Sequence, residues 1–270
     1  MTIQRGTHII HTVQPNDTVY SLSVQYQSSV NAITLANSLY PPFTDPYGLF
    51  LGQVLVIPKI LSTETQTFYV IQPRDTIGSI SNHFSTYPAL LVGINPTIHN
   101  PDFIVPTQQI QIPVFIYNVN IGDSFWSIAE RTGVSKDEML QANVNRLSIS
   151  PDLIFEGVNL IVPFPMSENI VVTQPFPGTV VRENEVIGGF ARAFEANVLY
   201  RLIDDNKVIV TEETFTTAES GAPSYSRFRD RIPFDTPPSA TQGELQVYTR
   251  SAKDGSVQDL VRTKVLFENL

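Results

Sequence analysis

The chain has 270 residues, of which 42% are hydrophobic and only 16% are charged. That balance excludes an intrinsically disordered chain, because disorder requires low hydrophobicity and many charges. A net charge of −9 argues against nucleic acid as a partner, since such binding depends on clustered Lys and Arg. The absence of cysteine excludes disulfides, thiolate catalysis and cysteine-ligated metals.

Targeting segments are not visible in this sequence. No apolar run approaches the ~20 residues of a membrane-spanning helix, so no membrane span is expected. Residues 1–8 lack the apolar core of a secretory signal, so no ordinary signal peptide is expected at this position.

Three segments of the chain share one pattern with two fixed intervals. An Asp is followed 20 residues later by an Asn, in the pairs Asp17 and Asn37, Asp75 and Asn95, and Asp123 and Asn143. Each copy then ends with two prolines 12 residues apart, namely Pro46 and Pro58, Pro101 and Pro113, and Pro151 and Pro163. Only the interval from the Asn to the first of these prolines varies, so we predict a loop there.

Each copy predicts the order strand–helix–helix–strand within ~50 residues. A short strand precedes a polar turn, and an Asp-Thr or Asp-Ser pair then supplies the N-cap of a first helix. Val19, Leu22 and Tyr26 recur at helical spacing after the first cap, and residues 30–36 predict a second helix. The equivalent second helices cover residues 88–94 and 135–142, and the closing strands cover residues 54–57, 110–112 and 159–162.

The third copy carries the most distinctive run, Gly-Asp-Ser-Phe-Trp-Ser-Ile-Ala at residues 122–129. With the helix-ending Asn and the closing Leu-x-Ile-Pro pattern, this run resembles the LysM domain. The resemblance covers residues 8–164 and departs from the family in three places. His11 replaces an opening aromatic residue, the first copy has a longer loop at residues 40–43, and Thr107 stands where glycine is usual.

The resemblance implies a ligand, because LysM domains bind glycans that contain N-acetylglucosamine, such as peptidoglycan and chitin. It implies a shallow groove between the strand-to-helix loop and the loop before the last strand. Loop backbone groups would meet the N-acetyl amide, and small apolar side chains would hold its methyl group. The first loops supply Asp17, Thr18, Val19, Asp75, Thr76, Ile77, Asp123, Ser124 and Phe125. The second loops supply Leu49, Phe50, Ile104, Val105, Ile154 and Phe155.

Structural roles compete with ligand contact at these positions. We expect the three aspartates to be N-caps first and ligand contacts second. The three asparagines are expected to end helices, because Asn tolerates the left-handed conformation of a C-cap. Trp126 is expected to cover the small core, with stacking on a sugar as the alternative. The apolar residues before the closing strands serve either a groove wall or the core.

The joints between the copies differ in length. Residues 61–67 leave slack between the first two copies, whereas residues 114–116 leave almost none between the second and the third. We therefore predict that the second and third copies are rigidly docked. Three copies in one chain would strengthen binding to a repeating polymer.

From residue 168 the helical spacing disappears and short β-rich runs alternate with turns. Seven or eight strands in ~100 residues predict a β-sandwich of immunoglobulin-like architecture. The runs at 174–178, 188–196 and 243–256 resemble the immunoglobulin-like domain of bacterial spore germination proteins, which implies a place in the spore envelope. The candidate strands cover residues 170–173, 185–190, 197–203, 207–210, 214–217, 226–232, 244–249 and 261–267.

The residue inventory of the C-terminal region argues against catalysis. All four histidines lie before residue 100, so this region offers neither a Ser–His or Cys–His nucleophile nor a His-rich metal site. Adjacent acidic pairs such as Asp204 and Asp205 point to opposite faces of a strand, which does not suit a glycosidase. Arg227, Arg229 and Arg231 should share one face, either as ordinary solvent-exposed residues or as a contact for an anionic wall polymer or partner protein.

The predicted protein is thus multidomain. Three small α+β modules at residues 8–60, 67–114 and 115–165 precede an all-β sandwich at residues 168–270. The predicted function is non-catalytic binding of peptidoglycan or chitin-type glycan, which anchors an interaction domain in the spore envelope or cell wall. No catalytic residue, cofactor or metal is predicted, and spore coat or other envelope proteins are candidate partners of the sandwich. The alternative is a structural or adhesive subunit of a spore surface, an appendage or a phage-tail-like assembly, whose repeats make protein contacts.

Overall fold

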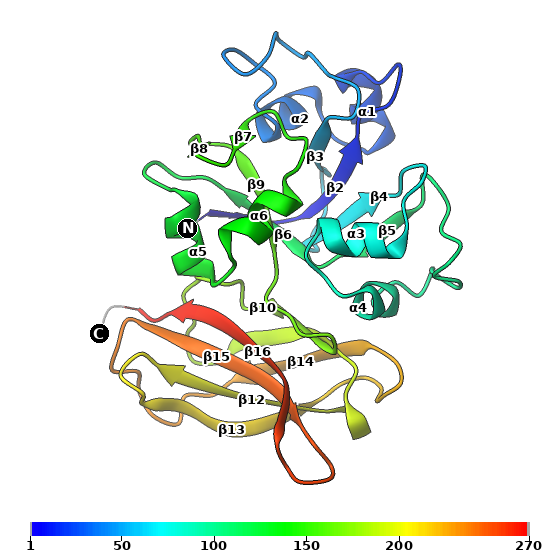
Figure 1. Ribbon diagram of the computed structural model, residues 1–270. Helices are drawn as coiled ribbons and strands as arrows, with labels where there is room; N and C mark the ends of the chain where they lie inside the picture. The colour runs from blue at the N-terminus through cyan, green and yellow to red at the C-terminus, as the bar shows by residue number, and fades with distance from the viewer. Residues whose placement is uncertain (1, 269–270) are drawn as a thin grey trace. The chain divides into compact units, whose positions relative to one another are not determined.

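The computed structural model describes residues 2–268 (Figure 1). These residues form two compact units. The first unit comprises the residues up to 85, with 97–127 and 135–163, and the second comprises 86–96, 128–134 and the residues from 164 onwards. No helix among the described residues is both long and apolar enough to cross a membrane.

The predicted strand–helix–helix–strand order occurs three times along the chain, which confirms the α+β prediction. The first copy contains β2 (Thr7–Thr12), α1 (Val19–Gln25), α2 (Val30–Ala36) and β3 (Val54–Pro58). The second contains β4 (Gln66–Val70), α3 (Ile77–His83), α4 (Pro88–Gly93) and β5 (Gln109–Ile112). The third contains β6 (Val114–Asn118), α5 (Phe125–Thr132), α6 (Lys136–Ala142), a small hairpin of β7 (Ile149–Ser150) and β8 (Leu153–Ile154), and β9 (Asn159–Pro163).

The first helix of each copy is capped by the hydroxyl residue and not by the aspartate, so that prediction is wrong. Thr18 Oγ1 accepts from the backbone N–H of Ser21 at 2.9 Å, and Ser21 Oγ accepts from the backbone N–H of Thr18 at 3.0 Å. The same reciprocal capping box occurs between Thr76 and Ser79 and between Ser124 and Ser127. The aspartates therefore do not cap these helices.

In the first and third copies an asparagine ends the second helix, but with a negative φ and not the left-handed one expected. In the second copy the C-cap is Ile94, one residue before Asn95, so the expectation that Asn95 ends the helix is wrong. Asn37 has a φ of −121° and Asn143 a φ of −113°. Their side chains are buried, and each amide bridges its helix to the closing strand. Asn37 Nδ2 donates to the carbonyls of Ile33 (2.9 Å) and Val56 (2.7 Å), and Oδ1 accepts from the Val56 N–H (2.7 Å). The Asn37 side chain thus makes the hydrogen bonds to the Val56 backbone in β3 that a neighbouring strand would otherwise make.

The joint between the first two copies is tied, which contradicts the slack expected at residues 61–67. Strands β2 and β4 pair in parallel, with Thr7 opposite Gln66 and Ile10 opposite Tyr69, so both copies share one sheet in the order β3-β2-β4-β5. Ser62 Oγ lies 2.6 Å from Thr7 Oγ1, which fixes the connecting segment to the start of β2. The sequence shows only that this segment is short and polar. It does not indicate which strand β4 will pair with.

The third copy recruits a strand from the other end of the chain. Strand β1 (Thr2–Gln4) pairs antiparallel with β6 and gives a sheet in the order β1-β6-β9, with Ile3 opposite Tyr117. Only Pro113 separates β5 from β6, so the joint between the second and third copies is short.

The C-terminal region forms two antiparallel sheets around one apolar core, as predicted. One sheet has the order β10-β11-β14 and the other β13-β12-β15-β16. The predicted strands at 207–210 and 214–217 are one strand, β13. The bounds are β10 (Ile170–Gln174), β11 (Glu185–Ala191), a 3-10 turn η1 (Phe194–Ala196), β12 (Asn197–Asp204), β13 (Ile209–Thr217), β14 (Ser226–Ile232), β15 (Gln242–Arg250) and β16 (Val257–Leu266).

Strand β14 shows the alternation of buried and exposed side chains that is typical of a sandwich strand. Phe228 and Ile232 are buried in the core, whereas Arg227, Arg229 and Arg231 share the exposed face, as predicted. Arg227 lies over the ring of Phe190 on the neighbouring strand, 5.4 Å from its centroid. The three arginines therefore form one solvent-exposed row, and at least one of them has a local aromatic partner.

Candidate functional site

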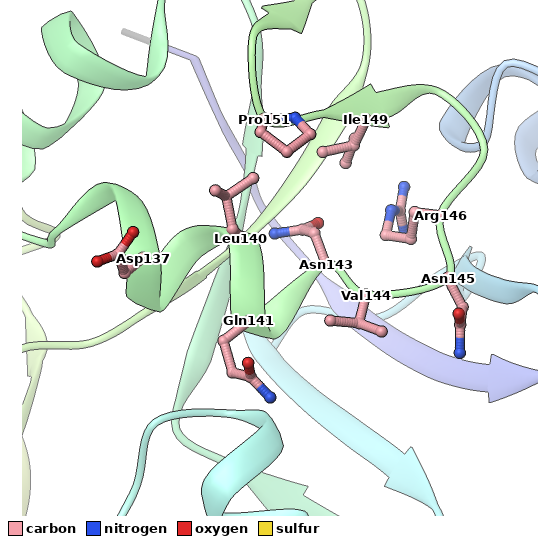
Figure 2. Close-up of a pocket in the computed structure, with 9 residues that line it drawn as sticks. All are labelled: Asp137, Leu140, Gln141, Asn143, Val144, Asn145, Arg146, Ile149 and Pro151. Atoms are coloured by element: carbon pink, nitrogen blue, oxygen red, sulfur yellow. The ribbon is translucent and has the colours of Figure 1, made fainter.

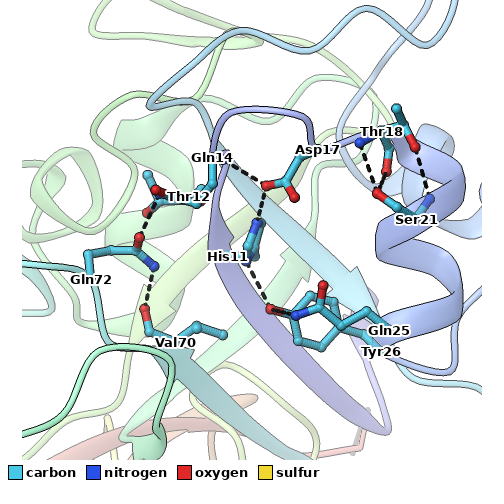
Figure 3. Close-up of polar contacts among 10 residues, drawn as sticks. All are labelled: His11, Thr12, Gln14, Asp17, Thr18, Ser21, Gln25, Tyr26, Val70 and Gln72. Atoms are coloured by element: carbon cyan, nitrogen blue, oxygen red, sulfur yellow. Dashed lines mark hydrogen bonds and ion pairs between the residues drawn. The ribbon is translucent and has the colours of Figure 1, made fainter.

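The strand-to-helix loop of each copy is one tight turn closed by its aspartate. The Asp17 carboxylate accepts from the backbone N–H of Gln14 at 2.7 Å (Figure 3). The third residue of the turn has a positive φ in every copy, 70° at Asn16, 76° at Arg74 and 82° at Gly122. The Asp75 and Asp123 carboxylates accept in the same way from the N–H groups of Gln72 (2.7 Å) and Asn120 (2.9 Å).

A side chain six residues earlier, on the opening strand, holds each of these carboxylates. Tyr69 donates its hydroxyl to Asp75 at 2.8 Å, and Tyr117 donates to Asp123. In the first copy His11 takes this place, with Nε2 2.8 Å from the Asp17 carboxylate. The departure of His11 from the family pattern therefore preserves the contact, because an imidazole N–H can replace a phenol as donor.

His11 also joins the loop to the core through Tyr26, as Figure 3 shows. Nδ1 lies 2.9 Å from the Tyr26 hydroxyl, and one tautomer satisfies both contacts, with Nε2–H donating to Asp17 and Nδ1 accepting from Tyr26. Burial and the nearby Asp17 charge raise the pKa of Tyr26 to about 12. Its hydroxyl consequently stays protonated at neutral pH and can serve as the donor.

The loop before each closing strand is a second tight turn. Its closing bonds run from Gln53 N to Phe50 O (3.0 Å), from Gln108 N to Val105 O (3.2 Å) and from Val158 N to Phe155 O (3.2 Å). The third residue of each turn again has a positive φ, 82° at Gly52, 74° at Thr107 and 82° at Gly157. Thr107 thus holds a conformation that favours glycine, which explains why glycine is usual there.

Backbone hydrogen bonds fasten the two loops of a copy side by side. In the first copy Gly52 N donates to Val13 O at 3.0 Å, and Val13 N donates to Gln53 O at 2.8 Å. The same pair of bonds links Ile71 with Thr107 and Gln108, and Val119 with Gly157 and Val158. These backbone hydrogen bonds therefore fix the two loops, which form the walls of each predicted groove, relative to one another.

The structure separates the fifteen predicted site residues into three groups. Four are buried, so their side chains support the core and cannot line a groove: Val19, Ile77, Phe125 and Ile154. Six hold the first turn or cap the helix, with half-buried aspartates and exposed hydroxyl residues: Asp17, Thr18, Asp75, Thr76, Asp123 and Ser124. Five apolar side chains of the second loops are half-buried or exposed: Leu49, Phe50, Ile104, Val105 and Phe155.

Several exposed apolar residues beside these loops were not predicted as site residues. Leu51, Phe103 and Ile121 are 73%, 75% and 83% exposed, although each is large and apolar. Trp126 is 71% exposed, so the expectation that it covers the core is wrong. Tyr20 occupies the equivalent position of the first copy. Tyr20 and Trp126 could have been predicted from the sequence, because each is a large aromatic residue directly after the buried first residue of a helix.

Loops of different copies meet within the first unit. Gln14 and Gln72, each the first residue of its turn, join through Gln14 Nε2 and Gln72 Oε1 at 2.7 Å (Figure 3). The long loop of the first copy reaches the third copy, where the rings of Phe43 and Phe155 lie 5.0 Å apart at an interplanar angle of 74°. Phe155 nevertheless remains 42% exposed, so the neighbouring ring does not cover it.

The described residues contain no group of three His, Asp or Glu side chains arranged for a metal ion. The loop aspartates accept hydrogen bonds from their own turns. The apolar rims and the neutral backbone of the turns therefore suit an uncharged polar ligand with apolar faces.

Comparison with known proteins agrees with the repeats and the sandwich. The LysM domain matches residues 11–58, 69–113 and 117–163, and the immunoglobulin-like domain of bacterial spore germination matches residues 169–256. The secreted LysM effector ECP6 of Passalora fulva is 28% identical over 58% of this chain and 78% of its own length. The N-acetylmuramoyl-L-alanine amidase sle1 of Staphylococcus epidermidis is 24% identical over 57% of this chain and 50% of its own length.

Among solved structures, the spore cortex-lytic enzyme SleL of Bacillus cereus is 30% identical over 39% of this chain, with a TM-score of 0.29. The match covers 22% of that enzyme. The chain thus spans half of the amidase and about a fifth of the cortex-lytic enzyme that it matches.

Proposed function

Because this chain belongs to the LysM family and carries three LysM domains before a spore germination immunoglobulin-like domain, we propose that it binds glycans containing N-acetylglucosamine without acting on them. Glycan and peptidoglycan binding is the property of the family. Both matched domain types are binding modules. The proposed role is to hold the chain on peptidoglycan of the spore envelope or cell wall, with chitin as a related ligand.

The observation that carries the proposal is the paired-loop geometry, repeated in all three copies. In each copy two tight turns lie side by side, fastened by a pair of backbone bonds, and large apolar side chains stand exposed on their rims. An N-acetyl sugar offers one carbonyl, one N–H and one methyl group, which match turn backbone and apolar rim respectively. A preformed site of this kind loses little conformational entropy on binding.

The three sites differ in one respect that predicts unequal affinity. Tyr20 and Trp126 stand exposed at the second position of their helices, whereas Gly78 occupies that position in the second copy. An aromatic ring can pack against the apolar face of a sugar, and glycine cannot. The first and third sites are therefore the stronger ones, and the second adds avidity along a polymer.

A structural or adhesive subunit is the second candidate. It is favoured by the parallel pairing of β2 with β4 and by the ring contact of Phe43 with Phe155, because both use repeat surfaces for protein contacts. Large assemblies in size-exclusion chromatography without any glycan would support it. A monomer that sediments only with glycan would exclude it.

The test is co-sedimentation with insoluble peptidoglycan and with chitin. We expect the chain in the pellet, and we expect the double variant Tyr20→Ser with Trp126→Ser to move largely to the supernatant. The matched control is Phe215→Ser, which removes an equally exposed aromatic residue (66%) from β13 of the sandwich. If all three proteins stay in the supernatant, or if the double variant sediments like the control, the proposed sites are wrong.

A further inference from the structure

Arg146, in the loop after α6, carries a buried and largely unpaired charge. The residue is 5% exposed. Its Nη2 donates to the carbonyl of Asn159 at 2.8 Å and lies 3.5 Å from the carbonyl of Ala36. Nε and Nη1, which together carry three N–H donors, have no acceptor within residues 2–268. No acidic side chain among the described residues forms an ion pair with it.

This arrangement is energetically unfavourable unless another group completes it. A buried guanidinium loses hydration that two carbonyl contacts do not replace. Burial lowers the pKa of Arg146 to about 9, which is still above neutral pH, so the side chain keeps its charge. A buried cation with vacant donors is the complement of an anion.

A pocket of about 480 Å3 lies beside this side chain (Figure 2). Gln141 and Asn145 supply amide groups to its lining, and Val144 and Ile149 supply apolar surface. Asp137, at the start of α6, is the other charged residue that lines it. A volume in this range accommodates a small ligand group.

We propose that this pocket binds a carboxylate carried by the wall glycan. A guanidinium with free donors recognises carboxylate or phosphate. The carboxylate of Asp137 in the same pocket disfavours a doubly charged phosphate more than a singly charged carboxylate. The apolar lining suits the methyl group that stands next to the carboxylate in a lactyl or alanyl unit. Peptidoglycan carries such groups, and chitin does not.

One small hairpin links the lining of the pocket to the predicted wall of the third groove. Ile149 of β7 lines the pocket and pairs with Ile154 of β8, which leads directly to Phe155 in the groove wall. The proposal places an N-acetyl group of the polymer in the groove and a neighbouring carboxylate in the pocket. This step rests on the proposed function. The residues three positions after the corresponding asparagines are Tyr40 and Ile98 in the other copies, so the charge belongs to the third copy alone.

Binding requires a local adjustment, because Nε and Nη1 are covered in the free chain. The side chain of Arg146 has to turn toward the pocket to meet the ligand. The three unsatisfied donors favour that rotation, since the ligand supplies acceptors that the free protein lacks.

The test compares N-acetylmuramic acid with N-acetylglucosamine, which lacks the lactyl carboxylate. Amide shifts of residues 144–149 are followed by NMR during titration, and shifts of residues 50–52 and 155–157 report the grooves. We expect at least tenfold tighter binding of the muramic acid at residues 144–149, and loss of that preference in Arg146→Met. The matched control Lys136→Met removes an exposed positive charge from the preceding helix α6 and should keep the preference.

A second variant and a second ligand distinguish the remaining explanations. Val144→Asp adds a negative charge at an exposed position of the lining (43% exposed) and should abolish carboxylate binding in a chain that folds. D-alanyl-D-alanine tests a peptide as the source: Arg146-dependent binding of this dipeptide instead of the sugar acid assigns the site to the stem peptide. An unchanged preference in Arg146→Met, or no shift at residues 144–149 with either acid, overturns the carboxylate site. Groove shifts with N-acetylglucosamine oligomers in the same samples would leave the proposed function standing.

Discussion

Asn37→Ala should unfold the first LysM domain far more readily than its size change suggests. The side chain is 5% exposed and makes three hydrogen bonds, to the carbonyls of Ile33 and Val56 and from the Val56 N–H. Alanine removes all three and adds none. The N–H and the carbonyl of Val56 then lie buried in β3 without that partner.

The size of the effect follows from those contacts. Each hydrogen bond contributes about 1 kcal/mol net, and an unpaired buried group costs about 1–3 kcal/mol. The two effects overlap, so we expect the local free energy of unfolding to fall by about 3–4 kcal/mol. A loss of 1.4 kcal/mol corresponds to a tenfold change in an equilibrium constant, so opening becomes on the order of a hundredfold more frequent or greater.

Amide hydrogen exchange resolves this effect domain by domain. Amides of β2 and β3 should exchange at least a hundredfold faster in Asn37→Ala, while those of β14 and β15 in the sandwich should not change. The control is Asn31→Ala, an exposed position of the same helix, which should shift stability by less than about 0.5 kcal/mol. Equal exchange rates in both variants would refute the structural role assigned to Asn37.

Three further changes test separate features. Trp126→Ala should weaken glycan binding by roughly 1–2 kcal/mol without changing the melting temperature, measured by calorimetric titration, because the ring is 71% exposed; a large loss of stability would mean that it serves the core. Gly157→Ala should destabilise by about 1 kcal/mol in urea unfolding, since a Cβ there meets no atom within 4 Å and only the φ of 82° opposes it; an unchanged midpoint would contradict this. Burial lowers the pKa of His8 to about 4, so the folded state binds fewer protons than the unfolded state below pH 6.5. Stability should therefore fall by up to about 3 kcal/mol between pH 6.5 and pH 4, and His8→Phe should reduce that fall; an equal fall in both proteins would exclude His8 as its source.

Features set by neighbouring residues were predictable from the sequence. The helix periodicities, the starting points of the first helices and the closing strands depend on contacts within one repeat, and three copies in register made each of them visible. The sandwich strands followed from period-two alternation, as at Phe228 and Ile232 on β14. The role of the aspartates was missed, because Asp and Thr are both good N-caps and only the geometry shows that Thr18 holds the helix while Asp17 closes the turn.

Features set by distant segments were not predictable. The pairing of β1 with β6 joins residues more than 100 positions apart, and any short extended segment could have occupied that edge. The contact of Phe43 with Phe155 depends on how the first and third LysM domains lie within one unit. In the sequence, Arg146 cannot be distinguished from an ordinary loop arginine, because its burial comes from surfaces supplied by other parts of the chain.

The most direct measurement is an NMR titration of the intact chain with N-acetylglucosamine oligomers of increasing length. Binding at the paired loops predicts saturable shifts confined to residues 14–20, 50–53, 72–78, 105–108, 120–126 and 155–158, with affinity rising as the oligomer lengthens. The second LysM domain should respond most weakly. Absence of any shift in these six segments at millimolar oligomer, or shifts confined to the sandwich, would contradict glycan binding by the LysM domains.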